Sequence, residues 1–130
     1  MNKTEVGLFI LRVVFGLTFL MHGLDKFSSG IDGTAGFFES IEVPGFMAGI
    51  VALIEVIGGL AILLGFATRL FSAIFAIIMM GAIYFAKLPA GFLGGYELDL
   101  ILLATSILFL LNGSRFLAIS ALFSGKLGKI

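Results

Sequence analysis

The 130-residue sequence contains no cysteine and no tryptophan, and it has only one histidine and two prolines. Without cysteine, the chain itself forms no disulfide, no thiolate metal site, no cysteine-ligated iron–sulfur cluster and no Cys-x-x-Cys relay. The single histidine, His22, excludes a haem held by two histidines of this chain and a di-iron centre built on paired Glu-x-x-His motifs. Redox chemistry would therefore need a bound cofactor or a partner chain.

Charge is also scarce. Only 12% of the residues are charged, whereas soluble domains average about 25%. Hydrophobic residues make up 60% of the chain and the mean hydropathy is +1.21, which is more apolar than a soluble bundle needs. The formal net charge is zero and no polybasic run occurs, so we do not expect nucleic acid as a partner. We interpret the chain as an integral membrane protein whose first partner is the lipid bilayer.

Four apolar segments predict an all-α, four-helix membrane bundle that forms one domain over residues 1–130. Each is about 19–21 residues long, close to the roughly 20 residues that span a hydrocarbon core. No cleavage pattern follows the first segment, which we interpret as a retained helix rather than a signal peptide. The predicted spans are Val6–Leu24, Phe46–Phe66, Leu70–Leu88 and Leu98–Leu117.

The first connection is long and carries its own pattern. Between Thr34 and Val43, the apolar residues fall on one face and the glutamates elsewhere, which favours a short amphipathic helix at the membrane interface. Such a helix would be capped by Asp32 or Thr34 and would end before Pro44. An ordered loop is the alternative interpretation.

Lysine and arginine are unevenly distributed between the two ends of the predicted bundle. Two basic residues, Lys26 and Lys87, fall on the side that also carries most of the acidic residues. The other side carries five: Lys3, Arg69, Arg115, Lys126 and Lys129. Because basic loops stay in the cytoplasm, we expect both termini inside.

Two ionisable residues lie within the predicted spans. Glu55 is at the centre of the second segment and Arg12 is in the inner half of the first. An unpaired charge at that depth costs about 2.5–3.5 kcal/mol on insertion scales, so we predict an Arg12–Glu55 pair. Such a pair serves either to fix the helix register or to support function.

Small residues form a stripe on each of the first two predicted helices. Gly16, Phe19 and Gly23 share the face of Arg12, and Ala52 and Gly59 share the face of Glu55. We expect the two helices to meet along these stripes, although a flat ring could also lie against the glycines.

Polar residues gather at the predicted outer ends of the first and fourth helices, where they would form a polar pocket. Each has a simpler interpretation as well: His22 as an interfacial residue bonded to a carbonyl, Lys26 as a snorkelling anchor, and Asp99 as a charge at a helix N-terminus. The set comprises His22, Asp25, Lys26, Glu97 and Asp99.

Several segments together resemble the DoxX family of membrane proteins, in order and at similar spacing, over roughly residues 8–115. The resemblance implies a four-helix membrane bundle described as an oxidoreductase or a subunit of one, in a family linked to thiosulfate:quinone oxidation and to quinone or catechol tolerance. The matching segments are Leu11–Gly16, His22–Phe27, Ala35–Glu39, Val43–Gly45, Glu55–Leu60, Leu64–Arg69 and Gly95–Leu98.

The sequence thus supports a quinone-linked oxidoreductase component of a bacterial-type plasma membrane, with no intrinsic cofactor evident and with a redox partner protein or a second copy as further partners. A non-catalytic assembly or lipophile-binding subunit and a small proton-coupled transporter remain as alternatives. The candidate catalytic residues are His22, Glu55 and Lys26. The candidate substrate-binding residues are Arg12, Gly16, Phe19, Gly23, Gly59, Glu97 and Asp99.

The predicted topology can be tested with reporter fusions. A fusion after Ile130 should report the cytoplasm, and one within the Ser28–Gly33 loop should report the outside, because of the five-to-two bias in basic residues. If both fusions report the same side, the four-span topology is wrong.

Overall fold

The computed structural model describes residues 2–122 and Ile130, and helices are the only regular secondary structure in that part of the chain. The long helices are α1 (Lys3–Ser28), α3 (Met47–Leu64), α4 (Thr68–Ala82) and α5 (Glu97–Asn112), and α2 (Ile31–Ser40) is short. The turns between α4 and α5 are η1 (Ile83–Lys87), η2 (Leu88–Ala90) and η3 (Phe92–Tyr96), and η4 (Ile119–Leu122) follows α5.

Four of these helical segments are long and apolar enough to cross a membrane, which confirms the predicted four-helix class. They run over Lys3–Ser28, Met47–Leu64, Thr68–Ala90 and Phe92–Asn112. The last span ends at Asn112 rather than at Leu117, because the chain leaves the helix at Gly113, where φ is +67°. Arg115 therefore lies in the segment that follows the helix.

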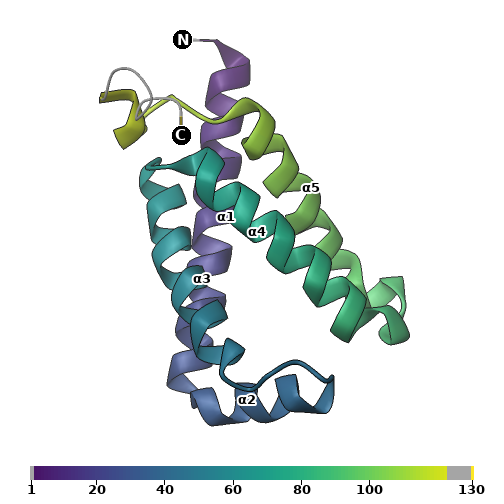
Figure 1. Ribbon diagram of the computed structural model, residues 1–130. Helices are drawn as coiled ribbons and strands as arrows, with labels where there is room; N and C mark the ends of the chain where they lie inside the picture. Colours follow the sequence, from purple (N-terminus) through teal and green to yellow (C-terminus); the bar gives the residue numbers. More distant parts are fainter. Residues whose placement is uncertain (1, 123–129) are drawn as a thin grey trace.

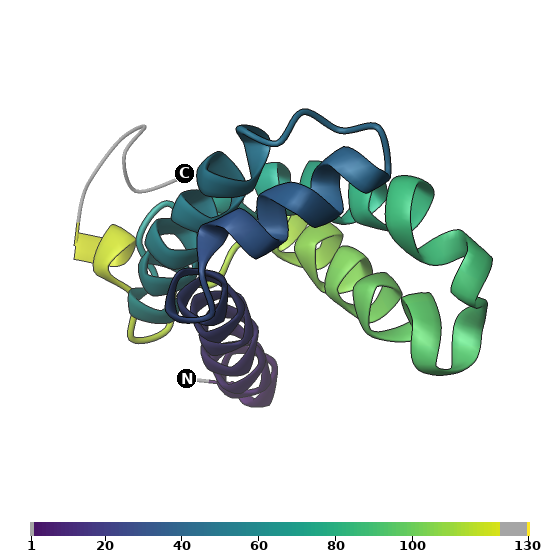
Figure 2. The same cartoon turned by 90° about the horizontal axis from the view of Figure 1, so that it is seen from below.

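The helices are arranged as two pairs. α1 packs along α3, and α4 packs along α5 (Figure 1). The pairs meet at the end of the molecule that holds the N-terminus, and they diverge toward the other end. Seen from below, α2 crosses this wider end between the two pairs (Figure 2). The bundle is thus tight at one end and open at the other.

Glycine allows the α1–α3 pair to pack backbone against backbone. A Cβ added at Gly16 would lie 2.6 Å from the backbone nitrogen of Leu63, and one added at Gly59 would lie 2.5 Å from that of Leu20. One added at Gly23 would lie 2.9 Å from the carbonyl oxygen of Ala52. These distances are too short for any side chain, which confirms that the two small-residue stripes meet.

Phenylalanine rings join the two pairs. Phe19 of α1 stacks on Phe75 of α4, with ring centroids 3.8 Å apart, and Phe15 stacks on Phe109 of α5 at 5.6 Å. All four rings are buried. They fix the pairs to each other in the middle of the molecule, and the open end begins beyond Phe19.

The first connection contains a helix, as the amphipathic pattern favoured. α2 begins after Gly30, earlier than the predicted caps Asp32 and Thr34, and it ends at Ser40, before Pro44. Its position at a membrane interface stays a prediction, as does the N-in/C-in orientation. Lys126 and Lys129, which contribute to that orientation, lie outside the described residues.

The glycine contact can be tested by replacing Gly59 with alanine. The new methyl group would collide with the backbone of α1, so we expect a loss of about 1–3 kcal/mol of stability, as for overpacked cores. Thermal unfolding in detergent, followed by circular dichroism, measures the effect.

Gly49→Ala is the matched control, because Gly49 lies in the same helix and an added Cβ there meets nothing within 4 Å. Alanine is intrinsically the better helix former, so Gly49→Ala should be neutral or stabilising. Equal behaviour of the two variants would contradict the close contact.

Candidate ligand cavity

A cavity of about 680 Å³ occupies the open end between the two helix pairs. Residues of α1, α2, α3, α4, η1 and α5 line it, so it exists only because the pairs diverge and α2 crosses the opening. Much of the lining is apolar, including Phe19, Phe37, Phe38, Ile78, Met79 and Leu102. Ligand sites typically combine such walls with a few convergent polar groups.

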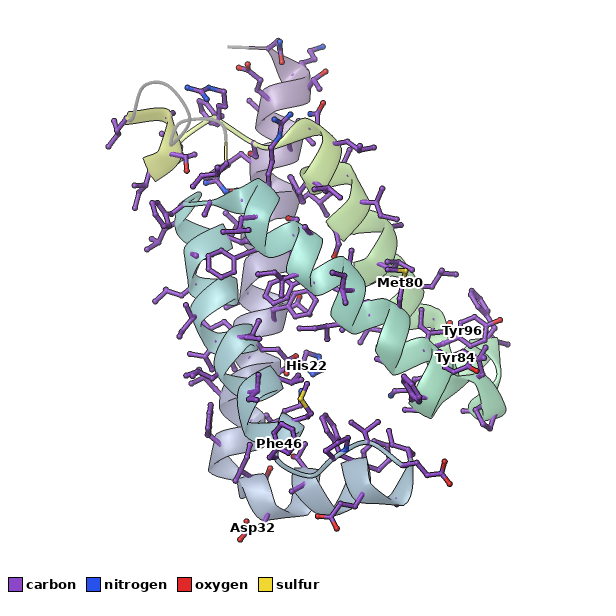
Figure 3. The ribbon with its side chains drawn as sticks, viewed as in Figure 1. His22, Asp32, Phe46, Met80, Tyr84 and Tyr96 are labelled. Carbon is purple, nitrogen blue, oxygen red and sulfur yellow. The ribbon has the colours of Figure 1, made fainter. Side chains whose placement is uncertain are left out.

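Polar groups line the same cavity. His22 and Lys26 come from α1, Glu55 from α3 and Asp99 from α5. His22 and Lys26 are one helical turn apart and therefore address the same space. In Figure 3, the His22 side chain extends into the space between the α1/α3 pair and α4. The structure thus brings together four of the predicted polar site residues.

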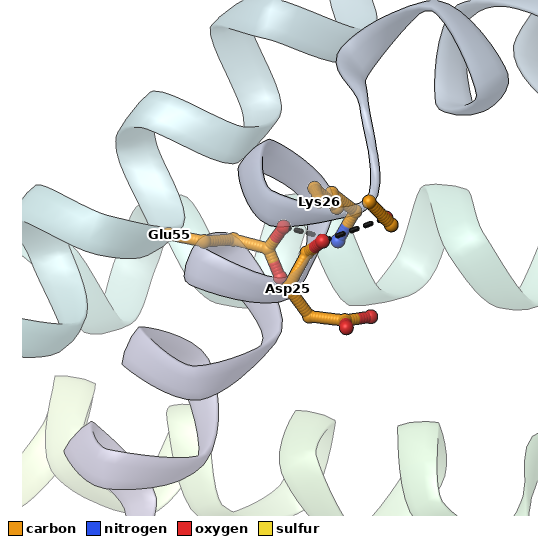
Figure 4. A network of polar contacts seen from close by, with 4 residues as sticks. Asp25, Lys26 and Glu55 are labelled. Atoms are coloured by element: carbon orange, nitrogen blue, oxygen red, sulfur yellow. Dashed lines mark hydrogen bonds and ion pairs between the residues drawn. The ribbon is translucent and has the colours of Figure 1, made fainter.

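Lys26 and Glu55 form an ion pair and a hydrogen bond between α1 and α3 (Figure 4). The Glu55 side chain is only 4% exposed, and that of Lys26 is 24% exposed. Gly23, one turn from Lys26, packs on Ala52 and Val56, which places Glu55 within reach of the lysine. An apolar surrounding makes such a pair costly to break, because one charge would be left buried alone.

The predicted Arg12–Glu55 pair is wrong. Arg12 is fully buried at the tight end, where its guanidinium donates to Ser114 Oγ at 3.2 Å and to the carbonyl oxygens of Phe116 and Leu117 at 2.8 and 2.9 Å. Its Cζ would lie 3.1 Å from a Cβ at Gly65. Gly65 follows Glu55 by ten positions, about 15 Å along a helix, so the register separates the two charges.

Asp99 and Glu97 have different environments. Oδ2 of Asp99 is buried and has no hydrogen-bond partner, although the residue lines the cavity. Oε1 of Glu97 accepts a hydrogen bond from Gly94 N at 3.1 Å, in the turn that precedes α5. Asp25 is exposed and does not line the cavity, although its carbonyl oxygen accepts from Ser29. Of Asp25, Glu97 and Asp99, only Asp99 lines the cavity.

The glycines named as substrate-binding candidates serve helix packing instead. Gly16, Gly23 and Gly59 are covered by the partner helix and are not part of the cavity lining, and neither is Arg12. Phe19 is part of the lining, but its ring is also stacked on Phe75. The α1–α3 seam is therefore closed to a flat ring, and of these candidates only Phe19 borders the cavity.

Sequence reasoning missed the walls that α2 and α4 contribute, such as Phe38 and Met79. Their only signal is an apolar residue at helical spacing, which is the same on a lipid-facing surface and on a cavity wall. Within the described residues, no group of three or more histidine, aspartate or glutamate side chains is arranged to hold a metal ion.

Comparison with known proteins identifies relatives. The DoxX family model matches residues 7–88. A Bacillus subtilis protein named "Putative oxidoreductase CatD" is 49% identical over 97% of this chain and 95% of its own. Inner membrane protein YqjF of Escherichia coli is 43% identical over 60% of this chain and 62% of its own. No solved structure matches. With four apolar spans and these membrane relatives, the chain is a multi-pass protein of a bacterial plasma membrane.

The Lys26–Glu55 pair can be tested with a double-mutant cycle in detergent. Glu55→Gln and Lys26→Gln should each reduce stability, and the double variant should lose less than the sum, with a coupling of about 0.5–3 kcal/mol. The reason is that either single change leaves one charge unpaired.

The matched control is the cycle of Glu55→Gln with Arg12→Gln, whose losses should add because the two side chains have separate partners. Additive losses in the Lys26–Glu55 cycle would show that the ion pair is not energetically significant.

Proposed function

Since the chain belongs to the DoxX family of membrane proteins, we propose that it is a membrane oxidoreductase component that binds a quinone-like lipophilic substrate. One observation carries the proposal: the cavity combines apolar walls with His22, the Lys26–Glu55 pair and Asp99. A quinone needs both features, because its ring is apolar and its two carbonyl oxygens accept hydrogen bonds.

The reaction is the two-electron reduction of a quinone. The ring takes up two electrons and two protons, and its two carbonyl oxygens become hydroxyl groups. The electrons come from a reduced partner protein or a diffusible reductant, because the chain has no thiol. Its own residues then have two tasks, which are to hold the ring and to move protons.

The polar residues divide these tasks. His22 donates a hydrogen bond to one carbonyl oxygen of the ring and acts as a proton donor to it. Lys26 provides positive charge where negative charge builds up on the ring oxygen, and Glu55 holds the lysine in place. The second proton comes from solvent at the open end, and Oδ2 of Asp99, which has no protein partner, accepts a hydrogen bond from the hydroxyl group that forms there.

A non-catalytic lipophile-binding subunit is the second candidate, and the ion pair itself favours it. Lys26 and Glu55 neutralise each other and join α1 to α3, a structural role that requires no chemistry. The cavity would then hold an apolar molecule beside Phe19 and Phe38 without a proton donor.

The two candidates differ in what His22 does. His22→Ala should weaken quinone binding about tenfold, or by about 1.4 kcal/mol, because the hydrogen bond to the ring oxygen is lost. Binding is measured by titrating a short-chain quinone into the purified protein in nanodiscs, and solvent extraction of the purified protein shows whether a quinone is already bound.

Asp25→Asn is the matched control, since Asp25 is on the same helix and at the same end but does not line the cavity. It should leave quinone affinity and folded yield unchanged. A folded His22→Ala protein with wild-type affinity would reject the proposed role and favour the non-catalytic subunit.

A further inference from the structure

A second cavity lies at the tight end of the molecule, where α4 begins and α5 ends, and we propose that it binds the phosphate group of an anionic ligand. Its volume is about 270 Å³. It is separate from the ligand cavity of the open end, and the two have no lining residue in common. The residues that carry the argument are Thr68, Arg69, Gly113, Arg115 and Ile130.

The first turn of α4 depends on an oxygen from outside the helix. Its N-cap residue, Ala67, has a left-handed backbone and offers no side-chain cap. The backbone N–H groups of Arg69 and Leu70 instead donate to an oxygen of Ile130, at 2.6 and 3.1 Å. Such N–H groups and the helix dipole favour negatively charged oxygens. The chain's own oxygen therefore occupies these two N–H groups, and a phosphate in the cavity would bind beside it.

Thr68 provides an independent indication of a ligand. Its side chain is buried, with the residue only 4% exposed, and Oγ1 has no hydrogen-bond partner. The same residue lines the cavity. A buried hydroxyl without a partner is costly, and an oxygen of a ligand in this cavity would remove that cost.

The charge of the cavity fits an anion. Two arginines, Arg69 and Arg115, line it, and none of the described lining residues has an acidic side chain; the Ile130 oxygen is engaged by the first amides of α4. Nη2 of Arg69 donates to the carbonyl oxygen of Leu111 at 2.8 Å, which anchors the guanidinium at the end of α5. A guanidinium has five N–H donors and binds phosphate oxygens in pairs. The unpartnered Thr68 hydroxyl and the two guanidinium groups together match several oxygens of one phosphate.

The cavity lies at the end of the bundle that carries Lys3, Arg69 and Arg115, which is the predicted inner side of the membrane. Anionic phospholipids attract basic residues there. A lipid headgroup and a soluble phosphate present the same oxygens, so both sources satisfy the chemistry.

The test measures phosphatidylglycerol retained by the full chain after transfer from mixed-lipid nanodiscs, using native mass spectrometry. Arg69→Gln and Thr68→Val should each reduce retention, the arginine variant by about tenfold. Lys3→Gln is the matched control, because Lys3 is an exposed basic residue at the same end that does not line the cavity. It should retain the lipid as the wild type does.

A second arm separates the two sources. If inorganic phosphate displaces phosphatidylglycerol, the site recognises a free phosphate group. If phosphatidylglycerol stays bound in the presence of inorganic phosphate, the site needs the whole lipid. Either result counts for the proposal only if Arg69→Gln weakens the interaction.

Two results would overturn the proposal. One is an equal loss in Lys3→Gln and Arg69→Gln, which would mean a general surface-charge effect. The other is full retention in folded Thr68→Val and Arg69→Gln. If Arg69→Gln does not fold, because it also removes the contact with Leu111, Thr68→Val and Arg115→Gln decide the question in its place.

Discussion

The backbone contact between α1 and α3 is the constraint on which the rest of the structure depends. Gly16, Gly23 and Gly59 leave no space between the helices, so the register of the pair is fixed. That register places Lys26 opposite Glu55 at the open end and Arg12 beside Gly65 at the tight end. Glu55 therefore gains a lysine partner and the Arg12 Nη groups gain hydrogen-bond acceptors, and the packing supplies both.

The ligand cavity is a consequence of the same geometry. Because α1 and α3 are in contact along their length, they present one continuous surface to the second pair, and the stacked rings of Phe19 and Phe75 hold the pairs together at the middle. Beyond those rings the pairs diverge, and α2 crosses the opening (Figures 1 and 2). The polar residues at that end face a space that their own helices do not fill.

The two ends of the molecule have opposite chemical characters. The open end combines apolar walls with an imidazole, an ion pair and an unpartnered carboxylate oxygen, which suits a lipophilic molecule that exchanges protons. The tight end combines two arginines with a buried hydroxyl that has no partner, which suits an anion. The segment after α5 joins α1 to the α3–α4 turn at this end. Its carbonyl oxygens accept hydrogen bonds from Arg12, and its Ser120 is hydrogen-bonded to the turn. The proposed substrate site and the proposed phosphate site therefore lie at opposite ends of the bundle.

By itself, the sequence determined the membrane class, the four spans, the meeting of the two glycine stripes and the absence of a thiol or a bis-histidine site. These features follow from composition and helical periodicity, which can be read from each segment without knowing what it packs against. It also grouped five polar residues at one end, because helix ends share a depth in the bilayer: His22, Asp25, Lys26, Glu97 and Asp99. Of these, Asp25 and Glu97 do not line the cavity. Only the tertiary structure decided the partners of Arg12 and Glu55. The partner of a buried charge depends on helix register and on backbone carbonyls such as that of Phe116. Neither of these can be read from the amino-acid sequence.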